Sequence, residues 1–405
     1  MPIQVFPTPS AGASYSSQPP ASASSVLLDG QLVTASSIST SVTGTGAPWL
    51  LYANGAGTTT ITIAGTPYTV TPGSTVGTSA YTSSQSVTVS APFTAPTTFT
   101  ASTMPSSSYW TNVAYGNGYF VAVQGSGTTA GAYSTNGTTW TASTMPSGGS
   151  AYGWQNVTYG NGYFVAVAGG TTAGAYSTNG TTWTASTMPS ASYWTGVTYG
   201  NGYFVAVQVS GTTAGAYSTN GTSWTASTMP SASQWFGVTY GNGYYVAVQN
   251  SGTTAGAYST NGSTWTASTM PSGGSTAGWN GVAYGNGYFV AVAYATTAGA
   301  YSTNGTSWTA STMPSSSTWD GVAYGNGYFV AVANGPTTVG AYSTNGTTWT
   351  ASTMPSSQNW SGVTYGNGYY VAVAQGAPNT TAGAYFAQTS IPIAYGIYNG
   401  ATVRA

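Results

Sequence analysis

Apolar and polar positions alternate with a period of two along most of this chain, and Asn-Gly turns interrupt the alternation at regular intervals. Between Val113 and Val123, two such runs flank the turn Gly116-Asn117-Gly118. Period-two β-formers around Asn-Gly predict a β-hairpin, because Asn and Gly accept the positive φ that hairpin turns require. A second hairpin is predicted around Asn136-Gly137, from residues 131–134 and 138–142. The pattern therefore indicates four short strands, called A to D here, and no helix.

The same unit occurs seven times, and each copy begins at a tryptophan: Trp110, Trp154, Trp194, Trp235, Trp279, Trp319 and Trp360. Successive tryptophans are 40 to 44 residues apart, a period that is typical of solenoids and propellers. Four antiparallel strands per repeat favour the blade of a propeller. The sequence thus predicts an all-β fold: a seven-bladed β-propeller of four-stranded blades, preceded by a small N-terminal β domain. We expect the repeated tryptophans to pack between blades.

The last copy has no D strand, since Ala384-Tyr385 runs on into Phe386 where Ser-Thr-Asn stands in the other copies. Residues 97–103, which precede the first copy, carry a D-like sequence instead. An open ring would expose strand edges, so we expect this segment to close the propeller. The tail, residues 391–398, is the alternative donor, with a poorer match.

Four segments follow from the changes in composition. Residues 1–25, rich in Pro, Ser and Ala, are expected to form an extended anchoring arm. Residues 26–95 are expected to form a small β domain for attachment to an assembly, with short strands at 31–33, 49–52, 58–63, 68–70 and 85–89. Residues 96–390 would form the propeller, and residues 391–405 a C-terminal tail.

Ionisable residues are almost absent: the chain has Asp29, Asp320 and Arg404, but no Glu, Lys, His or Cys. Acid–base and nucleophilic catalysis depend on such groups, so the sequence predicts that the chain is not an enzyme. A hydrolase that uses Asp320 alone is the remaining alternative. No metal or cofactor is expected, because two distant Asp residues offer at most one weak oxygen site with help from carbonyl groups.

The same composition limits the partners. One arginine argues against nucleic acid and anionic membranes as main partners, and no apolar run approaches the roughly 20 residues that span a bilayer. The first residues, Met-Pro-Ile-Gln, do not resemble a secretory signal. A net charge of −1 favours association. We therefore expect a multi-copy part of a larger assembly, held by other assembly proteins through its N-terminal region.

Differences among the copies gather in the B-to-C connection and in the D-to-A connection, which share one face of a propeller. The other two turns are nearly invariant. The variation indicates either drift in unconstrained loops or a recognition face, where aromatic rings stack on sugars and amides bind neutral partners. The candidate ligand-binding residues are Tyr109, Tyr152, Tyr193, Gln234, Phe236, Tyr294, Asp320, Asn334 and Asn359.

Two resemblances add to this interpretation. The stretch Tyr-Ser-Thr-Asn-Gly-Thr-Thr-Trp resembles the Asp-box of sialidase-like propellers, with Asn136 in place of the aspartate and a loop one residue shorter. The sialidase active site, with its arginine cluster, has no counterpart here. The whole repeat, from about 97 to 385, looks like propeller repeats in tail and other virion proteins of tailed bacteriophages.

Together these observations lead to a functional expectation. The chain is expected to be a non-enzymatic virion protein, such as a head or tail fibre or a decoration protein on the virion surface. Its propeller would recognise a neutral host glycan or protein. The alternative is a bacterial extracellular adhesin or matrix protein.

Overall fold

The protein is known from a computed structural model, which describes residues 26–28, 31–33, 37–42, 48–54, 59–70, 75–80, 85–90, 94–126, 129–148, 152–251, 254–272, 278–375, 382–388 and 394–398. Every regular element in these residues is a β-strand, and none of them forms a helix that could cross a membrane. The expected arm, residues 1–25, lies outside the described residues.

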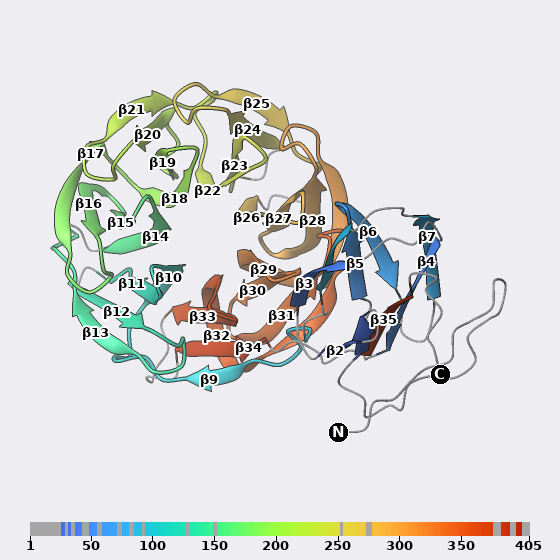
Figure 1. Ribbon diagram of the computed structural model, residues 1–405. Coiled ribbons are helices and arrows are strands. Elements are labelled where there is room, and N and C mark those ends of the chain that lie inside the picture. Colours follow the sequence, from blue (N-terminus) through green and yellow to red (C-terminus); the bar gives the residue numbers. More distant parts are fainter. Residues whose placement is uncertain are drawn as a thin grey trace. The chain divides into compact units, whose positions relative to one another are not determined.

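The chain divides into two units, Ala95–Gln388 and Met1–Thr94 with Thr389–Ala405. In the larger unit, four-stranded antiparallel sheets repeat along the sequence in the order A-B-C-D (Figure 1). The A strands are β10 (Trp110–Gly116), β14 (Trp154–Gly160), β18 (Trp194–Gly200), β22 (Trp235–Gly241) and β26 (Trp279–Gly285). The B strands are β11 (Tyr119–Gln124), β15 (Tyr163–Ala168), β19 (Tyr203–Gln208), β23 (Tyr244–Gln249), β27 (Tyr288–Ala293), β30 (Tyr328–Asn334) and β33 (Tyr369–Gln375).

The C strands are β12 (Ala130–Ser134), β16 (Thr171–Ser177), β20 (Ala214–Ser218), β24 (Ala255–Ser259), β28 (Thr296–Ser302), β31 (Thr337–Ser343) and β34 (Gly383–Ala387). The D strands are β13 (Thr141–Thr144), β17 (Thr184–Ser192), β21 (Thr225–Thr228) and β25 (Thr266–Thr269). Two longer strands, β29 (Thr309–Gly325) and β32 (Thr350–Gly366), each serve as the D strand of one repeat and the A strand of the next.

These long strands differ from the sequence-based expectation, which ended each repeat at Met-Pro. The backbone stays extended through Met-Pro and into the following tryptophan. The D strand also begins later than expected, at Thr141 rather than Thr138. The reason is that the amides of Thr138 and Thr139 donate to the side-chain oxygen of Asn136 and so belong to the turn.

The A-to-B turns have the predicted hairpin geometry. In the first repeat, Asn117 has φ +46° and Gly118 has φ +81°, and the strands on either side pair from Gly116–Tyr119 onwards. The C-to-D turns are held by side chains instead. Asn136 Oδ1 accepts from two backbone amides, and Ser134 Oγ accepts from the amides of Asn136 and Gly137. The side-chain oxygens of Asn136 and Ser134 thus hold the backbone of this turn.

Strand β9 (Thr100–Ser102) pairs antiparallel with β34, the C strand of the last repeat, with Ala101 opposite Ala384. The two lie side by side in Figure 1, although almost the whole unit separates them in sequence. Single parallel bridges link neighbouring D segments: Thr98–Thr353, Thr103–Thr139, Thr144–Thr182, Thr187–Ser223, Thr228–Thr264, Thr269–Ser307 and Thr312–Thr348. The segment before the first repeat therefore contacts both the first and the last repeats.

The apolar core lies between neighbouring sheets. Trp154, for example, packs with Val121, Val123 and Met145 of the preceding repeat. Each tryptophan at the start of an A strand is 0% exposed, as expected for packing residues. At the other end of each A strand, a glycine lies against the tyrosine ring of the next repeat, so that a Cβ atom on Gly116 would overlap the ring of Tyr159. This contact recurs in every repeat and ends with Gly366 against Tyr115.

The smaller unit contains two sheets. One has the order β2-β1-β35-β4-β7, and the other the order β3-β8-β5-β6. Their strands are β1 (Val26–Leu28), β2 (Gln31–Val33), β3 (Ser37–Val42), β4 (Pro48–Asn54), β5 (Thr59–Ile63), β6 (Thr66–Val70), β7 (Thr75–Ala80), β8 (Gln85–Ser90) and β35 (Ala394–Tyr398). The tail strand β35 pairs with β4 and β1 and not with the last repeat.

Candidate functional site

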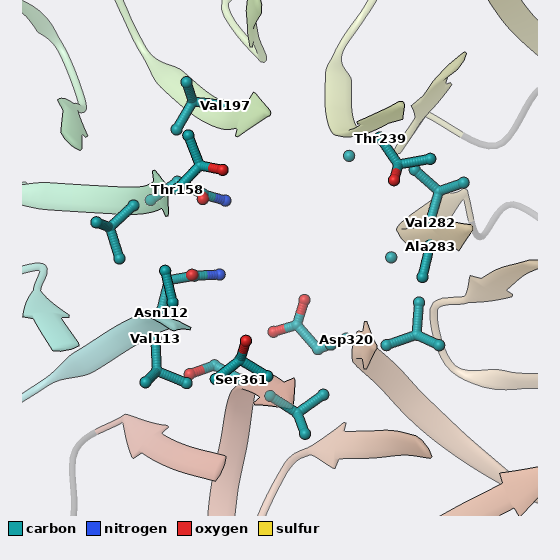
Figure 2. A pocket seen from close by; sticks show the side chains of 18 of the residues that line it. Asn112, Val113, Thr158, Val197, Thr239, Val282, Ala283, Asp320 and Ser361 are labelled. Atoms are coloured by element: carbon teal, nitrogen blue, oxygen red, sulfur yellow. The ribbon is translucent and has the colours of Figure 1, made fainter. Parts of the chain in front are cut away.

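The A strands line a central channel that contains a cavity of about 380 Å³. Side chains enter this cavity in layers, because successive residues of each A strand lie at successive depths. In sequence order along the A strands come polar residues such as Asn112 and Asp320, here called the polar layer, then valines such as Val282, the valine layer, and then small residues such as Ala283 and Thr158. Figure 2 shows these side chains around the central opening. Tyrosines, among them Tyr284, line the end next to the A-to-B turns. The two ends of the channel therefore differ in chemistry.

We call the end of the channel next to the A-to-B turns the turn end, and the end next to the B-to-C and D-to-A connections the loop end. The first residue after each repeated tryptophan lies at the loop end, and its role changes from repeat to repeat. In four repeats it donates a hydrogen bond to the tryptophan carbonyl of the next repeat: Thr111 to Trp154 (2.8 Å), Thr195 to Trp235 (3.1 Å), Asn280 to Trp319 (3.2 Å) and Ser361 to Trp110 (2.9 Å). The other three repeats have Gln155, Phe236 and Asp320 at this position, and all three line the cavity.

Asp320 is the acidic member of this layer, and an ionised carboxylate cannot donate a hydrogen bond. Its Oδ2 instead accepts from Nδ2 of Asn334 at 3.0 Å, and the same Nδ2 lies 3.5 Å from Oε1 of Gln375. The carboxylate is half-buried and projects into the channel (Figure 2). Loss of hydration raises its pKa to about 6, and the Asn334 hydrogen bond opposes this shift.

A second group of side chains gathers on the loop face beside the first three repeats. The rings of Tyr152 and Tyr193 lie 4.9 Å apart at 61°, an edge-to-face arrangement. Tyr109 lies near this pair, because the amide of Gly125 donates to the Tyr109 carbonyl at 2.8 Å and a Cβ atom on Gly125 would lie 3.2 Å from the Tyr152 carbonyl oxygen. Burial raises the pKa of Tyr193, and the neighbouring hydroxyls of Tyr152 and Tyr109 raise it further. Tyr152 is 54% exposed and Tyr109 is 41% exposed. Tyr193 lies over Gly169, whose absent side chain leaves room for the ring.

The remaining candidates do not join one site. Gln234 is exposed and Tyr294 is 45% exposed, each on the connection of a different repeat. Asn359 is half-buried and pairs across β32 and β33 with Gln375. The candidates thus separate into the tyrosine cluster (Tyr109, Tyr152 and Tyr193), the channel group (Phe236, Asp320 and Asn334) and three separate residues.

Sequence reasoning missed several channel residues, namely Asn112, Gln155, Asn156, Asn280 and Ser361. A signal for most of them was present. The two positions after the tryptophan vary among copies although they lie inside a predicted strand, whereas the valine that follows is invariant. Such variation beside an invariant valine is expected for side chains that face open space.

No protein-family model and no curated protein matches this chain. Solved structures do resemble it. Virginiamycin B lyase from Staphylococcus aureus aligns with a TM-score of 0.60 at 14% identity, over 70% of this chain and 95% of the lyase. YCF48 bound to D1 peptide aligns with a TM-score of 0.54 at 14% identity, over 73% of this chain and 96% of that one. Together with the repeated four-stranded sheets, this likeness shows an all-β, propeller-like fold.

The prediction that the chain is not an enzyme is contradicted by this comparison, because lyases are among its structural neighbours. The prediction took the lack of ionisable residues as decisive, but a propeller of similar shape does carry out a reaction. An identity of 14% shows the fold alone. The lyase activity is therefore not transferred to this chain, and composition does not decide whether this propeller is a catalyst.

Proposed function

We propose that this chain is a virion appendage or decoration protein whose propeller recognises a neutral glycan or protein on the host surface. The observation that carries the recognition proposal is the tyrosine cluster. Three tyrosines from successive repeats lie together, and two of them stay largely exposed although large apolar side chains are normally buried. Exposed aromatic rings with hydroxyl groups suit sugar rings and uncharged protein surfaces.

The contrast with the rest of the larger unit supports this proposal. Elsewhere the repeated tyrosines pack in pairs that recur in each repeat, such as Tyr163 with Tyr176 and Tyr203 with Tyr217. The cluster departs from this repetition, since the residue before the tryptophan of the four later repeats is Gln234, Gly278, Thr318 or Asn359. A cluster confined to one side of the loop face fits a single binding site better than a requirement of the fold.

The recognition proposal is tested with a panel of immobilised neutral oligosaccharides. We expect saturable binding to one class of glycan, and Tyr152→Ala should weaken it about tenfold, in line with roughly 1–1.5 kcal/mol for an aromatic contact. Tyr294→Ala is the matched control, because Tyr294 is similarly exposed but lies on the connection of another repeat. Equal loss in both variants, or no loss in either, would contradict a site at the cluster.

The virion proposal rests on the resemblance of the repeat to virion proteins and on the near-absence of charge, which suits dense packing in an assembly. Mass spectrometry of purified virions from the source of this sequence tests it. Chymotrypsin is the suitable protease, because the chain has 33 Tyr, 14 Trp and 10 Phe but only one Lys or Arg. Finding the chain in the envelope of uninfected bacteria, and not in virions, would favour the adhesin alternative.

We also propose that the propeller is a ring of seven blades in which β9 supplies the outermost strand of the last blade. The pairing of β9 with β34 and the series of bridges between D segments support this arrangement. Because the chain has no cysteine, a cysteine pair tests the closure without interference. Ala101→Cys with Ala384→Cys should form a disulfide under mild oxidation. The pair Ala101→Cys with Ala341→Cys, which places the second thiol in the C strand of another repeat, should not.

A further inference from the structure

The loop end of the channel carries an unbalanced charge. Among the residues that line the cavity, Asp320 is the acid, and none is Lys, Arg or His, since the chain has a single basic residue, Arg404. A carboxylate in a partly dehydrated site is costly unless a positive charge or several donors compensate it. Asn334 supplies one such donor. The Asp320 carboxylate therefore lacks a full set of compensating groups, and the site suits a cation from outside the chain.

Comparison of the repeats separates this role from a structural one. At the Asp320 position, four repeats use Thr, Ser or Asn to hold the next repeat, through the carbonyl of its tryptophan. Asp320 replaces that donor with an acceptor and forgoes the contact. Its two amide neighbours, Asn334 and Gln375, also occupy a position where the first three repeats have Gly125, Gly169 and Val209. Three polar substitutions thus converge at one point of the channel wall.

The shape of the cavity adds a second requirement. Beyond the polar layer, the channel wall consists of valines and small residues, and Phe236 lies in the wall at the loop end. Asn112 extends its side chain toward the open centre, as does Asp320 (Figure 2). A ligand that fits such a space has a positively charged, hydrogen-bond-donating head and a short apolar tail.

We propose that the loop end of the channel binds a small primary alkylammonium ion. Its N–H groups would donate to the Asp320 carboxylate and the Gln375 carbonyl oxygen, and its alkyl chain would contact the valine layer. Asn334 is the positioning residue, because its amide donates to Oδ2 of Asp320 and so fixes the orientation of the carboxylate. This site is distinct from the tyrosine cluster and takes a charged ligand, whereas the cluster is proposed to take a neutral one.

Calorimetric titration of the full chain with n-butylammonium chloride at pH 8 tests the proposal, with n-butanol as the neutral analogue. We expect saturable binding of the amine and at least tenfold weaker binding of the alcohol. Asp320→Asn, which keeps the shape and removes the charge, should weaken binding of the amine at least tenfold, and Gln234→Ala, at an exposed residue of another connection, should leave it unchanged. Amine binding should also fall about tenfold from pH 8 to pH 5, because protonation of Asp320 removes its negative charge. The other titratable residues of the cavity are tyrosines, a residue type that is neutral over this range.

Three results would overturn the proposal: no saturable binding of butylammonium, binding that Asp320→Asn leaves unchanged, or equal binding of butanol. If Asp320→Asn fails to fold, Asn334→Leu serves as the second variant, and it should weaken amine binding several-fold. Nα-acetyl-lysine methylamide carries the same ammonium group on a peptide backbone. Weaker binding of this compound than of butylammonium would assign the site to a free amine, and tighter binding would assign it to a lysine side chain.

Discussion

The two ends of the channel are built from the same A strands, yet they are constrained differently. At the turn end, each repeat places a tyrosine ring on a glycine of its neighbour, and the contact does not change from repeat to repeat. At the loop end, the residue after the tryptophan is Thr, Gln, Thr, Phe, Asn, Asp or Ser. The turn end thus depends on close packing between neighbouring repeats, whereas the residues at the loop end can differ from repeat to repeat. The largest departures from the repeat, the tyrosine cluster and Asp320, both lie at the loop end.

The strongest test of this contrast is Gly285→Ala at the turn end. The added Cβ would overlap the ring of Tyr324, and the tyrosine cannot move away without leaving its contact with Phe329, at 4.8 Å between ring centroids. We expect a loss of about 3 kcal/mol or more in the free energy of unfolding, measured as a lower urea midpoint. Gly287→Ala is the control, since its Cβ meets nothing within 4 Å and its positive φ alone should cost about 1–2 kcal/mol. Equal losses in the two variants would contradict the packing argument.

Asp320 tests the loop end through pH. Because its pKa in the folded protein is about 6, above the ordinary value of 3.8, the folded state binds the proton more tightly than the unfolded state does. This contribution to stability is complete below about pH 4 and is lost as the pH rises through 6. Two pKa units correspond to at most about 3 kcal/mol, and the partial exposure of the carboxylate reduces the effect to on the order of 1–2 kcal/mol.

The measurement is the melting temperature of the protein between pH 4 and pH 8, compared with that of Asp320→Asn. The native protein should lose stability across this interval relative to the variant, which has no group that titrates at this position. Other ionisable groups are common to both proteins and cancel in the difference. Parallel curves would show that Asp320 is ionised as easily in the folded protein as in the unfolded chain.

The parts of the fold that repeat in the sequence were the most predictable. The hairpins at Asn117-Gly118 and the equivalent turns follow from a local rule, because a positive φ at two successive residues selects Asn and Gly. The buried tryptophans follow from repetition itself. The continuous strands β29 and β32 could not be predicted from local signals, because Met-Pro is usually read as a strand end, and pairing with a neighbouring strand overrides that tendency.

The candidate site was predictable only in part. Tyr109, Tyr152 and Tyr193 were identified by their variation, but their association depends on how far each connection extends over its neighbour, which is a property of the assembled ring. The residues of the channel group come from two kinds of connection: Phe236 and Asp320 follow D-to-A connections, whereas Asn334 begins a B-to-C connection. Asp320 and Asn334 meet because β29 and β30 pair, whereas Gln375 comes from β33 of the next repeat. The sequence placed all three residues on one face but gave no reason for a cavity.

The smallest expected effect concerns the C-to-D turns, which lie at the turn end with the A-to-B turns. Nδ2 of Asn242, in an A-to-B turn, donates to the Thr303 carbonyl in the C-to-D turn of the next repeat. In that turn, Asn304 Oδ1 accepts from Ser302 Oγ and from the amides of Thr306 and Ser307. Asn304→Ala removes this acceptor and should cost about 1–2 kcal/mol, seen as a lower urea midpoint. Asn304→Asp keeps the acceptor oxygen and should stay within about 0.5 kcal/mol of the native protein at neutral pH. If the aspartate variant were as unstable as the alanine variant, the turn would depend on the amide group of Asn304 and not on its oxygen, and the turn end would be more specialised than its uniform sequence indicates.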